Sequence, residues 1–504
     1  MSDELNEGWQ ILRITDYYSH KIVAPSSWVQ ASFSEICRII GGSQPPKECF
    51  VMEQREGYIR LIQIRDYKTD KFATYIPTNL AKRFCNKGDI MIGRYGPPIF
   101  QILRGLEGSY NVALMKAEPN PQLVDKEFLY YFLQTANLFN YIAAASLRTA
   151  GQDGVRKEHL DNYPVFVPPL NEQRRIVAKI EELRERSQKA RSHLSAIPNL
   201  CDKFRQSVLA AAFRGDLTAD WREQNPDVEP ASMLSEALKR RSSQLDSDLE
   251  EYDLLDLPDS WIWVNIDSIS DVKGGKRLPK GEKLVENDTG YPYIKAGNLK
   301  NGTVTLDDIE YIPTRIQPLI KNYVVAAGDV YITIVGACIG DAGTICKELD
   351  GANLTENAAK ISNLSNANNE YLALWLRSPL CQKIIKTKIL SAAQGKLALT
   401  RIKTIPVPLA PIQEQSEIVT KSADILKSSD QTTELYEKIQ SNLDWLDRSI
   451  LAKAFRGELV EQDPNDEPAS ILLERIRAER EQQTQGNAKK PGKKGQRTIK
   501  TDPP

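Results

Sequence analysis

The amino-acid sequence predicts an α+β protein in which two similar globular α/β domains, related by a pseudo-two-fold, are separated by two long antiparallel coiled-coil helices. Three observations support this fold class. The chain repeats itself at a long and constant period, each copy ends in a heptad pattern of apolar residues, and short β-rich runs precede each heptad pattern.

The repeat is clearest at the junction between each domain and its helix. The string PPLNEQRRIV begins at Pro168 and returns as APIQEQSEIV at Ala410, an offset of 242 residues (410 − 168). SVLAAAFRGDL begins at Ser207 and returns as SILAKAFRGEL at Ser449, again at 242 (449 − 207). This period is far longer than a solenoid unit. The chain is therefore a duplicated domain with its helix, and it should present two similar working surfaces.

Further matches extend the duplication upstream. PSSWV at Pro25 matches PDSWI at Pro258, and the Gly-Gly pair at Gly41 matches the pair at Gly274. The offsets vary between 233 (258 − 25) and 243 (371 − 128), which indicates that loops differ in length while the framework is kept. Because the matched strings are apolar or turn-forming, the loops that differ are the candidates for binding different ligands.

Within each copy, β-rich runs such as 58–64 and 329–335 alternate with Gly, Pro and Asn turn signals. One helix is expected per copy, at 127–141 and at 370–385. This alternation is typical of a mixed α/β domain.

A heptad pattern follows each domain and predicts a coiled-coil seam. The positions expected along it are Ile176, Ile180, Leu183, Leu194, Ile197, Phe204 and Val208 in the first copy, and Ile418, Ile425, Tyr436, Ile439, Leu443, Leu446 and Ile450 in the second. Each seam is weak alone, so the two helices should pair with each other. Gly215 and Gly457 are natural helix ends, and Pro198 should kink the first helix.

These patterns divide the chain into consecutive segments. They are an N-terminal domain (1–167), a central helix (168–217), an acidic linker (218–257), a C-terminal domain (258–409), a distal helix (410–480) and a basic disordered tail (481–504).

The charge of the chain is uneven. The formal net charge is −1, but residues 220–259 hold twelve acidic and four basic side chains, a balance of −8, so the remainder carries +7 (−1 − (−8)). A solvated acidic linker therefore masks a basic remainder, which permits binding to DNA. The seven cysteines show no pairing pattern, and no apolar run approaches the ~20 residues that span a bilayer. With no export signal at the N-terminus, a cytoplasmic location is expected.

Motifs for catalysis are missing from the sequence. It contains neither a Gly-x-x-x-x-Gly-Lys-[Ser/Thr] phosphate loop nor an Asn/Asp-Pro-Pro-Tyr/Phe methyltransferase motif. Its three histidines all lie in the first copy, which argues against a duplicated metal site. A nuclease-like scatter at Asp259, Asp271 and Lys273 has no acidic counterpart in the first copy. We therefore expect no catalytic residue, no metal and no cofactor in this chain.

Major-groove recognition of DNA favours Arg, Lys, Asn and Gln on projecting loops, although each such residue is also an ordinary exposed side chain elsewhere. The loops that meet this description, among them the two Gly-Gly loops, supply the candidate DNA contacts. These are Arg65, Lys68, Arg94, Tyr95, Arg148, Gln152, Lys273, Lys276, Arg277, Lys280, Lys295, Asn298, Lys300, Gln394 and Lys396.

The chain resembles the specificity subunits of type I restriction–modification systems. The resemblance is carried by the Pro-then-Glu-Gln junctions at 168–173 and 411–415, the helix ends AAFRGDL and AKAFRGEL, LPDSWIWV at 257–264 and the string DPNDEPASILLERIRAER at 463–480. It implies two target recognition domains, each reading one half of a bipartite target in double-stranded DNA. It also implies helices that set the spacer and dock two methyltransferase subunits, in a prokaryotic cytoplasm.

The same resemblance implies that restriction subunits join the complex, and that S-adenosylmethionine, ATP and Mg are used by partner subunits. Two alternatives stay open from the residues alone. One is a coiled-coil adaptor that binds no nucleic acid, and the other is a stand-alone DNA-modifying enzyme, for which the motifs above are missing.

Overall fold

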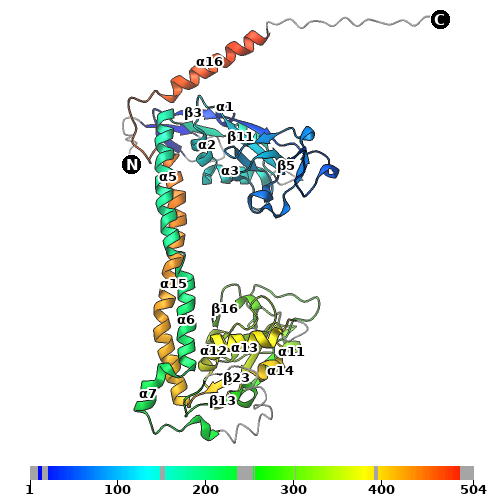
Figure 1. The fold of residues 1–504 in the computed structure, drawn as a ribbon, viewed down its shortest axis with the longest axis vertical. Coiled ribbons are helices and arrows are strands. Elements are labelled where there is room, and N and C mark those ends of the chain that lie inside the picture. The colour runs from blue at the N-terminus through cyan, green and yellow to red at the C-terminus, as the bar shows by residue number, and fades with distance from the viewer. Residues whose placement is uncertain are drawn as a thin grey trace, which may run out of the picture. The chain divides into compact units, whose positions relative to one another are not determined.

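The computed structural model describes residues 9–13, 21–147, 154–234, 254, 256–300, 302–390 and 395–488 (Figure 1). The chain forms two compact units, Met1–His193 with Ile439–Pro504, and Leu194–Lys438. The division cuts through the long helices and not between the two sequence copies. Each unit therefore contains one globular domain together with helical segments from both copies.

The first unit contains two four-stranded sheets, one of order β4-β11-β8-β9 and one of order β6-β5-β10-β7, with the two-stranded pairs β1-β2 and β12-β3. Its strands are β1 (Trp9–Arg13), β2 (Lys21–Pro25), β3 (Val29–Ser32), β4 (Cys37–Gly41), β5 (Tyr58–Ile62), β6 (Tyr75–Pro77), β7 (Phe84–Cys85), β8 (Ile90–Gly93), β9 (Gln101–Leu103), β10 (Gly108–Tyr110), β11 (Leu114–Pro119) and β12 (Pro164–Val167). Its short helices are α1 (Phe33–Ile36), α2 (Lys126–Phe132), α3 (Ala136–Leu147) and α4 (Lys157–Asp161).

The second unit repeats this topology. Its sheet of order β14-β22-β19-β20 corresponds to β4-β11-β8-β9, its sheet β18-β15-β21 corresponds to β6-β5-β10, and the pair β13-β23 corresponds to β3-β12. The strands are β13 (Ile262–Asn265), β14 (Asp271–Gly274), β15 (Pro292–Ile294), β16 (Leu299–Lys300), β17 (Thr303–Val304), β18 (Glu310–Tyr311), β19 (Val330–Thr333), β20 (Ala342–Thr344), β21 (Asn353–Leu354), β22 (Ala358–Ser362) and β23 (Pro406–Leu409). The short helices are α10 (Ile266–Ile269), α11 (Gln317–Ile320), α12 (Asn369–Arg377), α13 (Pro379–Leu390) and α14 (Leu399–Lys403).

Even the rare parallel strand pair is duplicated, as β5 with β10 and as β15 with β21. The α+β fold class with two copies of one domain, predicted from the repeat, is thus confirmed.

The expectation of one helix per domain was wrong, because each is divided in two. α2 starts at the N-cap Asp125, whose carboxylate accepts the N–H groups of residues 127 and 128, and α12 starts at the equivalent cap Asn368. α2 ends where the buried Thr135 hydroxyl donates to the Phe132 carbonyl at 2.8 Å. α12 ends before Pro379, which has no N–H to continue a helix.

The long helices are α5 (Leu170–Leu194), α6 (Ile197–Phe213), α15 (Ile412–Ala454) and α16 (Ala469–Ala488). The break between α5 and α6 immediately precedes Pro198, where the sequence predicted a kink. In the first unit α5 lies beside the C-terminal part of α15, and Arg191 binds Asp444 at 2.8 Å and Asp447 at 2.9 Å (Figure 1). In the second unit α6 contacts the N-terminal part of α15, through ion pairing of Arg205 with Asp430.

Both helix pairs are antiparallel, because the partner's residue number falls as the number along α5 or α6 rises. In the first unit Glu172 binds Gln462 and Arg191 binds Asp444. In the second unit Arg205 binds Asp430 and Thr218 binds Glu414. No helix among the described residues is long and apolar enough to cross a membrane.

The seam lies slightly differently from the heptad prediction. Phe204, Ile425 and Leu446 were predicted at the helix–helix seam, but their side chains are exposed by 44%, 36% and 41%. Leu426 is buried in place of Ile425, because a straight helix with 3.6 residues per turn drifts away from a strict 3.5-residue repeat. Of the other predicted seam positions, the buried ones are Ile176, Ile180, Val208, Ile418 and Ile450, and the half-buried ones are Leu183, Leu194, Ile197, Tyr436, Ile439 and Leu443.

Two predicted boundaries also differ from the structure. The distal helical segment is two helices, since α15 ends at Ala454 and α16 begins at Ala469 and continues to Ala488, into the predicted tail. The start of the acidic linker is structured and contains α7 (Ala219–Gln224), so it is not a simple solvated linker there. Residues 235–253 and 255 of the linker, and 489–504 of the tail, lie outside the described residues.

Candidate nucleic-acid interface

A buried glutamate at the start of α5 holds the first unit together. Glu172 is 1% exposed, and its Oε1 accepts the indole N–H of Trp28 at 2.9 Å and the side-chain amide of Gln462 at 2.7 Å. Burial raises the pKa of Glu172 above its ordinary value. The next residue, Gln173, accepts the backbone N–H of Asp125 at 2.8 Å. The Glu-Gln motif therefore joins the globular domain to its helix.

The second unit has the same anchor with a different partner. Glu414 is fully buried, and its Oε2 accepts the indole N–H of Trp261 at 2.9 Å. Its Oε1 accepts the hydroxyl of Thr218 at 2.7 Å and the guanidinium of Arg222 at 2.6 Å. The negative charge is thus paired with a cation here, whereas Glu172 has a neutral amide in the same role.

The helix ends of the two copies are exchanged between the units. Phe455, which directly follows α15, packs on Phe128 and Phe132 of the first domain, with ring centroids 5.0 and 5.5 Å apart. Phe213, which ends the first-copy helix, packs on Tyr371 and Trp375 of the second domain, at 5.2 and 5.1 Å. The phenylalanine of each repeated FRG string therefore packs the end of a long helix onto the globular domain of the other copy.

The second glycine of each Gly-Gly pair marks a crossing of two backbones. A β-carbon on Gly42 would lie 1.9 Å from the Asn111 carbonyl oxygen, and one on Gly275 would lie 2.1 Å from the Thr355 carbonyl oxygen. Only glycine fits such a close approach. The crossing holds the start of an outward loop at the same place in both domains.

The turn that follows β5 in the first domain and β15 in the second is also duplicated. In the first domain Asp66 accepts the N–H of Gln63 at 2.9 Å, and in the second Asn298 accepts the N–H of Lys295 at 3.0 Å. Both acceptors are 3% exposed. Asn298 was predicted to contact DNA, but the structure buries its side chain within the protein, because the turn needs it there.

Arg94 was also predicted as a DNA contact. In the structure its guanidinium binds backbone carbonyls of the first domain itself. Its Nε donates to the Val155 carbonyl at 3.0 Å and its Nη1 to the Val112 carbonyl at 3.1 Å. The cation lies 5.2 Å from the ring centroid of Tyr95, which is half-buried. These two residues fix local loops of the domain.

The other predicted DNA contacts are placed as follows. Lys295 is ion-paired with Glu310, and Arg277 is ion-paired with Glu356 at 2.7 Å while its side chain stays 77% exposed. The remaining exposed candidates are Arg65, Lys68, Lys273, Lys276, Lys280, Lys300 and Lys396. The predicted contacts Arg148, Gln152 and Gln394 lie outside the described residues.

Loop residues 273–284 bring several of these cations together in the second domain. Lys276 lies 5.5 Å from the Tyr323 ring centroid, and its backbone N–H donates to the Leu354 carbonyl at 2.8 Å. Lys280 and Lys283 are exposed on the same loop, directly after the Gly275 crossing. The loop is therefore a basic surface anchored at one end.

Three features were missed by sequence reasoning. The first is Phe72, an exposed aromatic residue beside two cations, which the string Lys-Thr-Asp-Lys-Phe at 68–72 could have indicated.

The second is a further repeat, because Glu-Pro-Ala-Ser occurs at both 229–232 and 467–470. In each case the alanine N–H donates to a serine carbonyl, from Ala231 to Ser260 and from Ala469 to Ser27. The third is a group of exposed apolar residues on the long helices, Leu200, Leu435 and Trp445.

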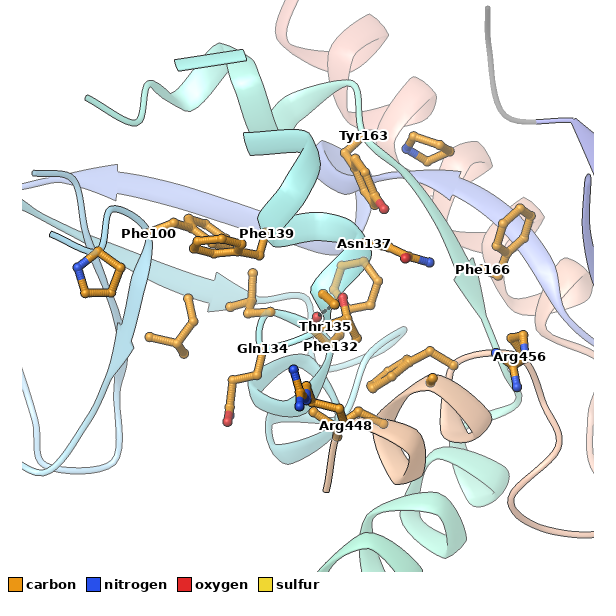
Figure 2. A pocket seen from close by; sticks show the side chains of 18 of the residues that line it. Phe100, Phe132, Gln134, Thr135, Asn137, Phe139, Tyr163, Phe166, Arg448 and Arg456 are labelled. Carbon is orange, nitrogen blue, oxygen red and sulfur yellow. Dashed lines mark hydrogen bonds between the residues drawn. The ribbon is translucent and has the colours of Figure 1, made fainter. Parts of the chain in front are cut away.

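A hollow of about 480 Å³ lies in the first unit beside the end of α15 (Figure 2). Figure 2 shows its aromatic lining, which includes Phe100, Phe132 and Phe139, with Arg448 reaching in from α15. Its walls are mostly apolar, and its polar lining residues include no carboxylate and no histidine; they are Gln134, Thr135, Asn137, Tyr163, Arg448 and Arg456. In the part of the chain that the structure describes, no cluster of His, Cys, Asp or Glu could hold a metal ion.

Comparison with known proteins agrees with this geometry. The family model described as the type I restriction modification DNA specificity domain matches residues 25–193 and 258–444. The type I restriction enzyme EcoBI specificity subunit of Escherichia coli is 27% identical, over 90% of this chain and 92% of that protein. The EcoKI specificity subunit of Escherichia coli strain K12 is 25% identical, over 90% of this chain and 96% of that protein.

A similar fold is found in a solved structure. A chain from a study of complex assembly and conformational transition of the type I R-M system superposes with a TM-score of 0.60 at 19% identity. The alignment covers 86% of this chain and 99% of that chain.

Proposed function

Because this chain belongs to the family of type I restriction–modification DNA specificity domains, it is a DNA specificity subunit, and we propose that each globular domain reads one half of a bipartite target. The observation that carries the proposal is that the two domains share one framework but differ in the residues on their outward loops. The turns at Asp66 and Asn298 and the crossings at Gly42 and Gly275 are the same in both domains. Two copies of one fold with different loops suit two different base sequences.

The chain itself acts by binding, in this proposal, and chemistry is supplied by partners. S-adenosylmethionine, ATP and Mg are then used by methyltransferase and restriction subunits. The cations on the outward loops, Lys273, Lys276 and Lys280 among them, support contact with phosphates and bases because they are exposed.

The long helices are proposed to set the spacer between the half-sites and to dock two methyltransferase subunits. Apolar side chains on their outer faces support docking, since Leu200 is 60% exposed on α6 and Trp445 is 65% exposed on α15. Tryptophan in particular is enriched among the residues that anchor protein–protein interfaces. Exposed apolar residues of this kind lie in both units, Leu200 and Leu435 in the second and Trp445 in the first, which fits one methyltransferase subunit per unit.

The test is methylation by reconstituted components. The chain is mixed with the methyltransferase subunit from the same host and S-adenosylmethionine, and adenine methylation is mapped on a DNA library. The expected result is one bipartite sequence methylated only when both proteins are present. Methyl transfer by the chain alone would favour a stand-alone enzyme, and equal methylation with and without the chain would favour an adaptor that reads no DNA.

A further inference from the structure

One turn in each globular domain has the same backbone support but a different outward side chain. The turn follows β5 in the first domain and β15 in the second, and a buried side chain at its fourth position accepts the N–H of its first residue. These acceptors are Asp66 and Asn298, each 3% exposed. The residue just before each acceptor is therefore presented from an equivalent position.

That outward residue is Arg65 in the first domain and Gly297 in the second. The side chain of Arg65 is 52% exposed. A β-carbon added to Gly297 would meet no atom within 4 Å, so a side chain has room there too. The same backbone hydrogen bond therefore supports this position in both domains, while the residue is an arginine in one and a glycine in the other. Such a position is a candidate for determining which bases each domain recognises.

Arg65 is also held in a definite direction. Its Nη2 lies 3.4 Å from both the Thr74 hydroxyl and the Phe72 carbonyl, and its guanidinium carbon lies 5.7 Å from the Phe72 ring centroid. Lys71 lies 5.5 Å from the same ring. Phe72 is 43% exposed, so an aromatic face and a guanidinium are presented together on the surface. Such prior ordering lowers the entropic cost of binding.

The charge of Arg65 is not neutralised at close range. Its carboxylate contact is Asp66, at 3.9 Å. Arg104 offers a contrast, because Glu127 pairs with it at 2.6 Å while its guanidinium stacks on Tyr130 at 3.9 Å. The contacts that orient Arg65 are made to neutral oxygens at 3.4 Å, longer than the ~2.9 Å of a typical N–H···O bond.

We propose that Arg65, backed by Phe72, reads a guanine in the half-site of the first domain, and that Gly297 is the equivalent reading position of the second domain. An arginine donates two hydrogen bonds to O6 and N7 of guanine in the major groove, and an apolar side chain beside it suits a thymine methyl group. This inference rests on the proposed function, in which each domain reads one half-site.

The test compares Arg65→Ala with Arg55→Ala in the complete methyltransferase complex. Arg55 is an exposed arginine of the same domain, outside the duplicated turn. Methylation is mapped on a library in which every target position is randomised. Arg65→Ala should lower discrimination by roughly 5- to 150-fold at one base pair of one half-site. Arg55→Ala should leave all base preferences as in the wild type.

The reciprocal variant Gly297→Arg should introduce or change a preference at one base pair of the other half-site only. A uniform loss of methylation on all sequences in Arg65→Ala would overturn the proposal, because it would mark a phosphate contact. Unchanged base preference in both variants would overturn it as well. If the wild-type complex itself shows no bipartite preference, the proposed function fails, which is a distinct result.

Discussion

Trp28 donates its indole N–H to the carboxylate of Glu172 at 2.9 Å, although 144 positions separate the two residues in the chain. The equivalent bond in the second unit joins Trp261 and Glu414 at the same distance. Each bond fixes the residue directly before a strand, β3 in the first unit and β13 in the second, to the start of a long helix. The two anchors differ in their other partners, and this difference makes them separately testable.

Glu414→Gln should destabilise the second unit, and Glu172→Gln should have little effect on the first. Both donors to Glu172 use Oε1, so an amide oxygen can replace it, and the expected cost is within about 1 kcal/mol. Glu414 uses both oxygens and pairs with Arg222, so the amide would leave that cation without its carboxylate, at a cost of about 2–3 kcal/mol. Calorimetric melting of both variants tests the prediction. Equal losses would contradict it.

The stability contributed by the Glu172 site should fall as pH rises. Burial raises the pKa of this carboxyl in the folded chain above 4.5, its ordinary value, so folding favours the protonated form. The contribution is fully present below about pH 4.5 and is lost as pH rises through the folded pKa. Glu172→Gln does not titrate, so the wild type should lose stability relative to this variant over that range. A constant difference between pH 4 and 8 would refute the pKa direction.

Gly275→Ala should disrupt the second domain, whereas Gly274→Ala should be tolerated. The new methyl group would lie 2.1 Å from the Thr355 carbonyl oxygen at position 275, but 3.5 Å from Leu399 at position 274. We expect a loss of about 1–3 kcal/mol for the first variant, typical of an overpacked site, and less than about 0.5 kcal/mol for the second. Urea unfolding followed by tryptophan fluorescence measures both. Similar midpoints would show that the backbone crossing yields easily.

Trp445→Ser should weaken binding of the methyltransferase subunit without loss of stability. The side chain is 65% exposed on α15, so little packing within the chain is lost. An anchor residue at a protein interface commonly costs 2 kcal/mol or more when truncated, about a 30-fold weaker Kd. Titration calorimetry with the methyltransferase subunit gives the value. Gln431→Ala, an exposed polar position on the same helix, is the control and should bind as the wild type does.

Adding one heptad to each long helix should lengthen the DNA spacer that the complex accepts. Seven residues inserted after Ala196 and seven after Lys438 keep the seam in register and add about 10 Å of helix. Because DNA rises ~3.4 Å per base pair, the spacer should grow by about three base pairs. Methylation mapping reports both spacing and base identity. A change of bases at constant spacing would show that the helices do not set the distance.

The repeat in the sequence determined much of this protein. Constant offsets between matched strings require the same fold twice. The periodicity of apolar residues and the turn signals are local properties, so a single sequence displays them directly. The junction strings around Glu172 and Glu414 and the helix ends at Phe213 and Phe455 were all visible as matches. Their equivalence predicted the two-domain fold class and the antiparallel helices.

Only the tertiary structure decided which residues the matched strings contact. Packing of Phe455 on Phe128, from the other copy, depends on contacts between segments hundreds of residues apart, for which the sequence carries no local signal. The same reason explains Arg94 and Asn298, which look like exposed binding residues in sequence but bond to the protein's own backbone. Arg65 has a similar sequence context, but its side chain stays 52% exposed beside Phe72, and only the folded backbone distinguishes it from Arg94 and Asn298.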